Sequence, residues 1–404
     1  MKRGAWHQFG DRSQLLALEQ LAQGFGSGVV ISPRDISRER AVELSPEYAD
    51  ANADVMIDPQ FYLPDSKVGR LSTYEELVAF RQSAAHLHKM PDQQVAALQT
   101  ALHKLCHELH VSAVISPAVI YEAGRPDIVE LNAKLFGAAK SVGDALGVPT
   151  LATLVVGASA TSSDQTTESI VSDATSLSAD GWYFSFESGE DRIPGSHNLI
   201  LRLGKTGLAL ACTGKPLFLA FAGPVALLAP AFGATAVGIG HSQNLWQFTR
   251  ERWEPQDGNG GGGGDAPPRL FSTSLWGTII YQDEFALLSE GLRAAILTAT
   301  PFSAPVSVSP PYLPWGRWEA GKHMVTLLCR HATNALQELD AEKACEKATA
   351  HLTAAVILHS KVAGEGIQLA DGSNSYQNSW RAALESLRAS CADQFEFLRM
   401  IRGL

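Results

Sequence analysis

The sequence lacks the features of a membrane or secreted protein. No apolar run reaches roughly 18 residues, the length needed to span a bilayer. The N-terminal stretch MKRGAWHQFGDRSQ has no apolar core of a secretory signal. The five cysteines are dispersed without CxxC spacing, which disfavours a disulfide framework or a zinc site. We therefore expect a cytoplasmic protein with reduced thiols, no membrane contact and no bound metal.

Motifs for phosphate-bearing cofactors are also lacking. The sequence contains no Walker motif, and its glycine-rich GFGSG segment precedes a strand-like run, whereas a dinucleotide fingerprint follows one. No block of Lys and Arg is present, and 42 acidic residues against 32 Lys plus Arg give a net charge of −10. Phosphate contacts dominate nucleic-acid binding, so this charge gives no support to a nucleic-acid partner, and any such contact would depend on a local patch. We expect no cofactor.

The sequence does contain short apolar runs that alternate with longer helical patterns. Near-continuous apolar runs indicate strands buried on both faces. Eight such runs are expected as strands, over residues 28–33, 54–59, 112–117, 149–156, 181–186, 216–221, 236–241 and 275–281.

Eight strand–helix alternations predict an α/β fold, a (β/α)8 TIM barrel. An open doubly wound sheet is the main alternative, because a sequence does not show closure. We expect the barrel domain over residues 1–318, with a flexible glycine-rich surface loop at 257–268. A C-terminal helical segment is expected over 319–404, where helices rich in Ala and Leu could form a homodimer or partner surface.

Active sites of such barrels lie at the C-terminal ends of the strands, which turns the strand ends into candidate site residues. Asp58 directly follows an apolar strand and precedes Pro59, so its carboxylate could bind a polar ligand edge, with Gln60 beside it. Asp35 and Glu187 hold the corresponding places on two other strands. The alternatives are a helix-capping or loop-ordering role for both aspartates and a solvated loop position for Glu187.

His241 ends the strand at 236–241 and could act as a general acid or base, because the pKa of an imidazole is near neutral. The same GHSQN segment supplies Asn244 and could present Ser242 as a nucleophile, but the second glycine of a nucleophile elbow is missing. We take His241 and Asp35 as candidate catalytic residues. A plain polar neighbour is the alternative for His241.

Three passages together resemble the tRNA-guanine transglycosylase superfamily, barrel enzymes that exchange guanine for a 7-deazaguanine base. SPRDISRERAVELSPEYADANADVMIDPQFY (32–62) follows the layout of that family's helix start and Asp-ending strand. ADGWYFSFESGED (179–191) is similar to its Glu-containing turn, and KPLFLAFAGPVALLAPAFGATAVG (215–238) to its most specific passage. The resemblance covers roughly residues 28–250.

The resemblance implies a barrel that binds a purine or deazapurine base. It places Asp58 at the base-recognising position, with Gln60, Glu187, Gly223 and Asn244 as further base contacts. The chain departs from the family at the nucleophilic Asp, where the count along the passage gives Gly238, and it lacks the family's Cys-rich zinc motif. A covalent glycosyl intermediate needs a carboxylate nucleophile, so the chemistry or the acceptor is expected to differ.

Two other functions stay open. The first is a barrel enzyme of another class, such as a lyase, an aldolase-type enzyme or a hydrolase, although no lysine ends a predicted strand to form a Schiff base. The second is a non-catalytic barrel that binds or assembles with a partner, which the missing carboxylate and the helical segment from Glu319 to Leu404 favour.

Overall fold

The computed structural model covers residues 1–404, and its description excludes residues 11–12, 88–90, 190–192, 255–266, 307–314 and 371–374. The side chains of residues 82–87 and 375 are excluded as well. Most of the predicted glycine-rich loop at 257–268 therefore lies outside the described residues.

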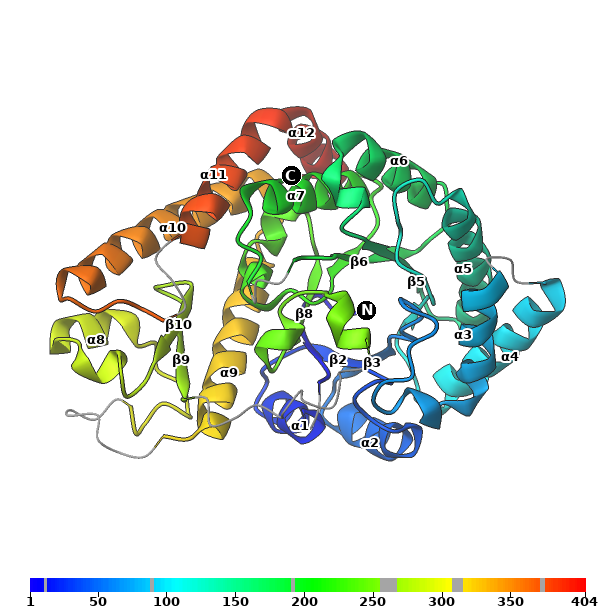
Figure 1. Cartoon of the computed structure of the whole chain (residues 1–404), viewed down its shortest axis with the longest axis horizontal. Helices are drawn as coiled ribbons and strands as arrows, with labels where there is room; N and C mark the ends of the chain where they lie inside the picture. The colour runs from blue at the N-terminus through cyan, green and yellow to red at the C-terminus, as the bar shows by residue number, and fades with distance from the viewer. Residues whose placement is uncertain (11–12, 88–90, 190–192, 255–266, 307–314, 371–374) are drawn as a thin grey trace.

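Eight parallel strands form one sheet in which neighbours in the chain are neighbours in space, with the order β3-β2-β1-β8-β7-β6-β5-β4. The two ends of this order also meet, because the backbone N–H of Ser112 beside β4 donates to the carbonyl of Val55 in β3 at 2.8 Å. This is the closed order of a TIM-like (β/α)8 barrel and excludes an open doubly wound sheet (Figure 1). The strands are β1 Gly4–Gln8, β2 Gly28–Ile31, β3 Asp54–Ile57, β4 Val114–Ile115, β5 Thr150–Val156, β6 Gly181–Phe186, β7 Leu217–Leu219 and β8 Ala236–Gly240.

The barrel begins one strand earlier than the sequence predicts. Its first strand is β1, whose last two residues, His7 and Gln8, are polar and buried. The predicted eighth strand at 275–281 is wrong: β10 (Gly277–Ile280) pairs antiparallel with β9 (Arg269–Ser272) in a separate two-stranded sheet. Its apolar residues pack in a cluster of their own with the surrounding loops and helices, so an apolar run there did not indicate a barrel strand.

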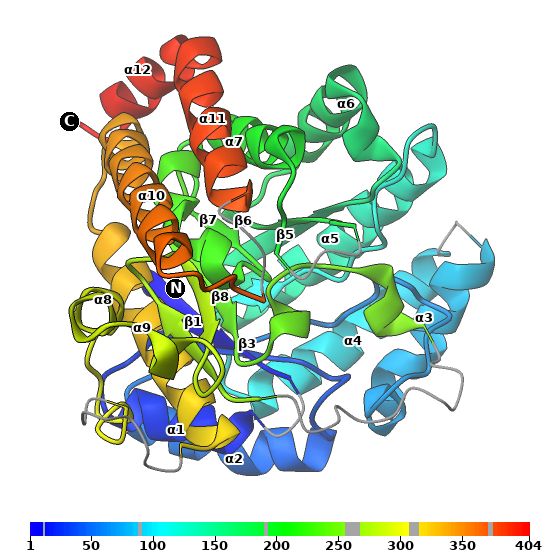
Figure 2. The same ribbon diagram turned by 60° about the vertical axis from the view of Figure 1, so that its left-hand side comes forward.

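Helices surround the barrel, and the C-terminal helices complete the ring. The long helix α9 packs against β1 and β8, while α11 and α12 pack against α7 on the outside, with α10 beside α11 (Figures 1 and 2). The helices are α1 Gln14–Ala22, α2 Arg38–Asp50, α3 Glu75–Leu87, α4 Asp92–Glu108, α5 Pro126–Leu146, α6 Asp164–Thr175, α7 His197–Ala211, α8 Glu290–Ile296, α9 Arg317–Ala335, α10 Ala341–Gly364, α11 Ser375–Ser390 and α12 Ala392–Ile401.

Alternate residues of each strand fill the barrel interior. Trp6 of β1, Tyr183 of β6 and Phe218 of β7 belong to one buried cluster inside the barrel, and Trp6 meets the edge of the Phe218 ring at 5.7 Å. Gly28 of β2 makes room for Trp6, because a Cβ at Gly28 would lie 2.7 Å from the indole ring. Since side chains alternate along a strand, His7 next to Trp6 points outward.

Candidate functional site

The carboxylate of Asp58 lies buried at the C-terminal end of β3, inside the barrel mouth. Its Oδ1 accepts from the backbone N–H of Gln60 at 3.0 Å, and its Oδ2 accepts from the hydroxyls of Tyr62 at 2.7 Å and Tyr183 at 3.3 Å. Each carboxylate oxygen has two lone pairs, so Oδ1 retains capacity for a further donor. Asp58 thus offers acceptor capacity at the place where barrels of this type hold their sites.

Burial raises the pKa of Asp58 to about 6, although the hydrogen bonds from Tyr62, Gln60 and Tyr183 and the nearby charge of Arg81 act in the opposite direction. Loss of hydration disfavours the charged form of a carboxylate, and the tyrosine hydroxyls compensate only in part. A carboxyl group that titrates in this range can exchange a proton or accept hydrogen bonds near neutral pH.

Asp35 forms a buried ion pair with Arg252, and both side chains are nearly inaccessible to solvent. The same carboxylate accepts from the Ser32 hydroxyl at 2.5 Å and pairs with Arg34 at 3.0 Å. Gln60 joins this cluster to Asp58, because its Nε2 donates to the Ser32 hydroxyl at 2.8 Å. The predicted residues Asp35, Asp58 and Gln60 therefore come together, but Asp35 is engaged by two guanidinium groups.

The segment Leu245–Trp253, which we call the capping segment, follows β8 and covers the barrel mouth. The Tyr62 ring meets Phe248 at 5.0 Å and Trp253 at 5.6 Å between ring centroids, and Phe248 meets Phe221 at 5.5 Å. These four rings, which we call the aromatic cluster, occupy the mouth beside Asp58. A planar ligand would reach Asp58 by displacing part of the capping segment.

Polar contacts fix the capping segment on both sides of the mouth. On one side Arg252 pairs with Asp35, and on the other Arg250 forms ion pairs with Glu187, at 2.7 Å, and with Glu122. Glu187 also accepts from the backbone N–H of Ala158 at 2.7 Å. The predicted base contact Glu187 thus lies at the mouth, and its carboxylate anchors the capping segment.

The strand ends at the mouth contain strained backbone. Gln60 and Phe221 are non-glycine residues with positive φ, of 56° and 50°. Such a conformation costs on the order of 1–3 kcal/mol and persists where surrounding contacts hold it. The Phe221 N–H is held by the Oε1 of Gln8 at 2.7 Å. Strain of this kind concentrates at binding and catalytic sites, which agrees with the place of Asp58.

His241 points away from the mouth. Its Nε2 lies 3.0 Å from Nδ1 of His7, on the outer side of the barrel, and the other nitrogen of His7 lies 2.7 Å from the carbonyl oxygen of Phe25. Because Nε2 of His7 must donate to that carbonyl, its Nδ1 accepts from His241. The predicted base contact Asn244 is exposed and accepts from Ser242. Neither His241 nor Asn244 lies with Asp58.

Two glycines reveal what fills the mouth. A Cβ at Gly238, the position of the nucleophile in the resembled family, would lie 2.5 Å from Oε1 of Gln8, so the Gln8 amide occupies that space. Its Nε2 donates to the Tyr183 hydroxyl at 2.9 Å. The predicted base contact Gly223 has φ +45°, and a Cβ there would lie 2.4 Å from Trp246 of the capping segment. No sequence signal pointed to Gln8, which lies on the unpredicted strand.

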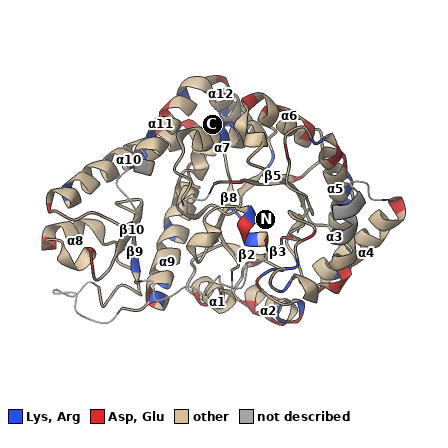
Figure 3. Ribbon diagram, viewed as in Figure 1, with Lys and Arg blue, Asp and Glu red and all other residues tan. Residues whose placement is uncertain are grey.

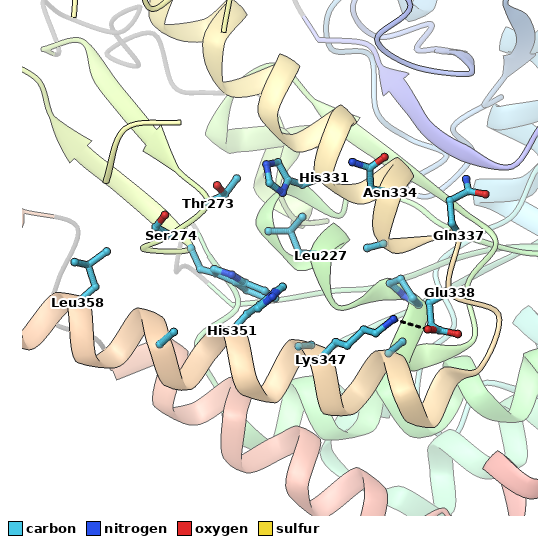
Figure 4. Close-up of a pocket in the computed structure, with 16 residues that line it drawn as sticks. Leu227, Thr273, Ser274, His331, Asn334, Gln337, Glu338, Lys347, His351 and Leu358 are labelled. Atoms are coloured by element: carbon cyan, nitrogen blue, oxygen red, sulfur yellow. Dashed lines mark hydrogen bonds and ion pairs between the residues drawn. The ribbon is translucent and has the colours of Figure 1, made fainter. Parts of the chain in front are cut away.

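Two of the larger cavities lie in different places, one beside the mouth and one outside the barrel. One, of about 570 Å³, is lined by the loop after β3 and by α3. The other, of about 740 Å³, lies outside the barrel between β9–β10, α9 and α10. Figure 4 shows His331 and His351 pointing into it from facing helices, with the Lys347–Glu338 ion pair (2.6 Å) at one end. None of the predicted site residues lines either cavity.

The surface charges do not mark a binding face. Figure 3 shows Lys and Arg interspersed with Asp and Glu on the outer helices, with no face of one sign in this view.

Within the described parts of the chain, no three His, Cys, Asp or Glu side chains are grouped to hold a metal ion. The described helices include none with the length and apolar character needed to cross a membrane. All five cysteines are unpaired, and four are buried.

Comparison with the models of known protein families and with curated protein sequences finds no match. Among solved structures the chain is similar to nitroalkane oxidase from Streptomyces ansochromogenes, with 13% sequence identity over 96% of each chain and a TM-score of 0.30. A TM-score this low carries no argument about fold or function. The functional conclusion therefore depends on the residues of the site.

Proposed function

We propose that the barrel mouth binds a guanine or 7-deazaguanine-type base, with Asp58 accepting hydrogen bonds from the N–H edge of the base. The observation that carries this proposal is the buried Asp58 carboxylate, which has free acceptor capacity and lies beside an aromatic cluster. Guanine presents neighbouring ring and exocyclic N–H donors, and a carboxylate can accept both.

The aromatic cluster supports a planar ligand. Base–aromatic stacking contributes about 1–3 kcal/mol per base, and Tyr62, Phe221 and Phe248 all border Asp58 or its hydrogen-bond partners. In the closed arrangement the rings pack against one another. A base would replace a ring of the capping segment in this cluster, so binding requires that Phe248 or Trp253 move outward.

The chemistry differs from glycosyl exchange through a carboxylate at position 238. Gly238 has no side chain, and the Gln8 amide fills the adjacent space. Two other acids of the mouth are already paired: Asp35 with Arg252 and Arg34, and Glu187 with Arg250. The proposed role is therefore recognition of the base, with altered chemistry or a different acceptor. His241, which pairs with His7 outside the mouth, takes no part in it.

The test is a calorimetric titration of the full chain with guanine, 7-deazaguanine and adenine. We expect saturable binding of the first two and binding of adenine at least tenfold weaker, because adenine lacks the paired N–H edge. Asp58→Asn should weaken guanine binding at least tenfold, since a carboxamide oxygen cannot accept as a carboxylate does. Asp50→Asn, at the exposed end of α2, is the matched control.

Absence of saturable binding of either guanine-type base would overturn the proposal. Equal binding by wild type and Asp58→Asn would remove Asp58 from the site. In the first case, a lyase, a hydrolase or an assembly role would become the better account of the barrel.

A further inference from the structure

The cavity of about 570 Å³ at the rim of the barrel lies on the loop that follows β3 and on the first turns of α3. It is lined by Pro64, Asp65, Ser66, Lys67, Leu71, Ser72, Val78 and Arg81. None of these residues forms a hydrogen bond with Asp58, so the cavity borders the proposed base site without sharing its hydrogen-bonding residues.

Arg81 is the unusual member of this lining. Its side chain is 3% exposed, and one terminal nitrogen donates to the backbone carbonyl of Pro59. Within the described part of the chain its Nε has no hydrogen-bond partner, and no carboxylate pairs with the guanidinium. Burial lowers the pKa of Arg81 to about 10, so the guanidinium is still charged at neutral pH. The Asp58 carboxylate favours this charge from beyond ion-pair distance, and the guanidinium carbon lies 5.4 Å from the centroid of the Phe61 ring. An anion in the cavity would add the direct ionic partner that the buried guanidinium lacks.

A second cation and two hydroxyls border the same space. The exposed ammonium of Lys67 has no ion-pair or hydrogen-bond partner among the described residues. Ser66 and Ser72 add hydroxyls, of which Ser66 donates to the Trp253 carbonyl at 2.6 Å. Asp65, also exposed, is the single acid of the lining. Two cations against one carboxylate leave this lining with a net positive charge, in a chain whose net charge is −10.

We propose that this cavity binds a phosphate group, with Arg81 and Lys67 as its cationic ligands. A guanidinium matches phosphate oxygens through parallel N–H donors, and an ammonium adds a point charge. A phosphate monoester carries about −1.5 to −2 charges at neutral pH, enough to balance both cations. The volume exceeds that of inorganic phosphate, so the natural ligand is a small organic phosphate. The inference does not depend on base binding at Asp58.

The test uses the full chain and inorganic phosphate as the probe, with sodium chloride adjusted to hold ionic strength constant. We expect saturable binding by calorimetry and a matching rise in the thermal midpoint. Arg81→Gln should weaken phosphate binding about tenfold or more, because it removes a buried charge-assisted donor. Lys67→Ala should weaken it about fivefold, because solvent screens the exposed ammonium. Lys104→Ala, an exposed lysine of α4, should leave binding unchanged.

The exposed position of Lys67 keeps the test valid if the Arg81 variant fails to fold. The inference is overturned if wild type shows no saturable phosphate binding, or if Lys67→Ala weakens it no more than Lys104→Ala does. Succinate is the second probe. Binding of succinate as tight as that of phosphate would also overturn the assignment, because the site would then select carboxylates.

Discussion

Replacement of Asp58 by Asn tests the electrostatics of the barrel mouth through stability. Burial raises the pKa of this carboxyl from 3.8 to about 6. The folded protein therefore holds a proton that the unfolded chain releases between these values, and folding stability contributed by Asp58 falls as pH rises through this range. One pKa unit corresponds to about 1.36 kcal/mol, so the shift of about two units corresponds to about 3 kcal/mol.

The carboxamide of the Asp58→Asn variant cannot ionise, so the variant lacks this pH-dependent term. We expect the free energy of unfolding of Asp58→Asn to rise relative to wild type by about 2 kcal/mol between pH 4 and pH 7, with the rest of the change below pH 4, and to stay level above pH 7. Replacement of the carboxylate by an amide also changes the hydrogen bonds with Tyr62 and Tyr183. This change shifts the stability difference between the two proteins by the same amount at every pH, so it does not produce the pH dependence.

The assay is urea denaturation of both proteins at half-unit steps from pH 4 to pH 8. We subtract the unfolding free energy of wild type from that of Asp58→Asn at each pH. The titration of every other group that is independent of position 58 cancels in this difference. Asp50→Asn, at the exposed end of α2, controls for the loss of one negative charge. A difference that varies by less than about 0.5 kcal/mol across this range would refute the argument that burial holds the Asp58 carboxyl protonated.

Three further predictions concern the parts that close and support the mouth. Gly223→Ala should destabilise the fold by about 2–4 kcal/mol in urea denaturation, because the new Cβ would clash with Trp246 at 2.4 Å and φ is +45°; an unchanged midpoint would contradict this packing. Arg252→Ala should lower the free energy of unfolding by about 3–5 kcal/mol, since it leaves the buried Asp35 without its main partner. A decrease of less than 1 kcal/mol would argue against a closed capping segment. Burial lowers the pKa of His7 to about 4, so between pH 6.5 and pH 5 the unfolded chain binds a proton that the folded protein does not. As the pH falls through this range, the free energy of unfolding of wild type should therefore fall by about 2 kcal/mol more than that of His7→Gln. Parallel plots of unfolding free energy against pH for the two proteins would show that His7 titrates normally.

The sequence was informative where burial alone determines the pattern. Seven of the eight barrel strands were predictable, because strands covered on both faces are continuously apolar. β1 was missed because His7 and Gln8 are polar, and their burial depends on partners far along the chain: His241 and Phe25 for His7, and Tyr183 and Phe221 for Gln8. An apolar run also misassigned β10, since hydrophobicity does not show which strand a segment pairs with.

The alternation of side chains along a strand predicts which residues point into the barrel, and the sequence prediction did not apply this rule to the candidate site residues. Tyr183 faces the barrel interior, and Glu187, four residues on, lies on the same side of its strand. The same rule puts Ala236, Gly238 and Gly240 inward and His241 outward, as found. Arg252 could not be predicted as the partner of Asp35, because 217 residues separate them and the pair forms only when the capping segment folds over the mouth.

The most direct test of the central claim is a crystal structure of the full chain grown with 7-deazaguanine. The account predicts the base stacked in the aromatic cluster, with its N–H edge on the Asp58 carboxylate and Phe248 or Trp253 displaced from the mouth. A base bound elsewhere, with the Asp58 contacts to Tyr62 and Tyr183 intact and the capping segment closed, would contradict it.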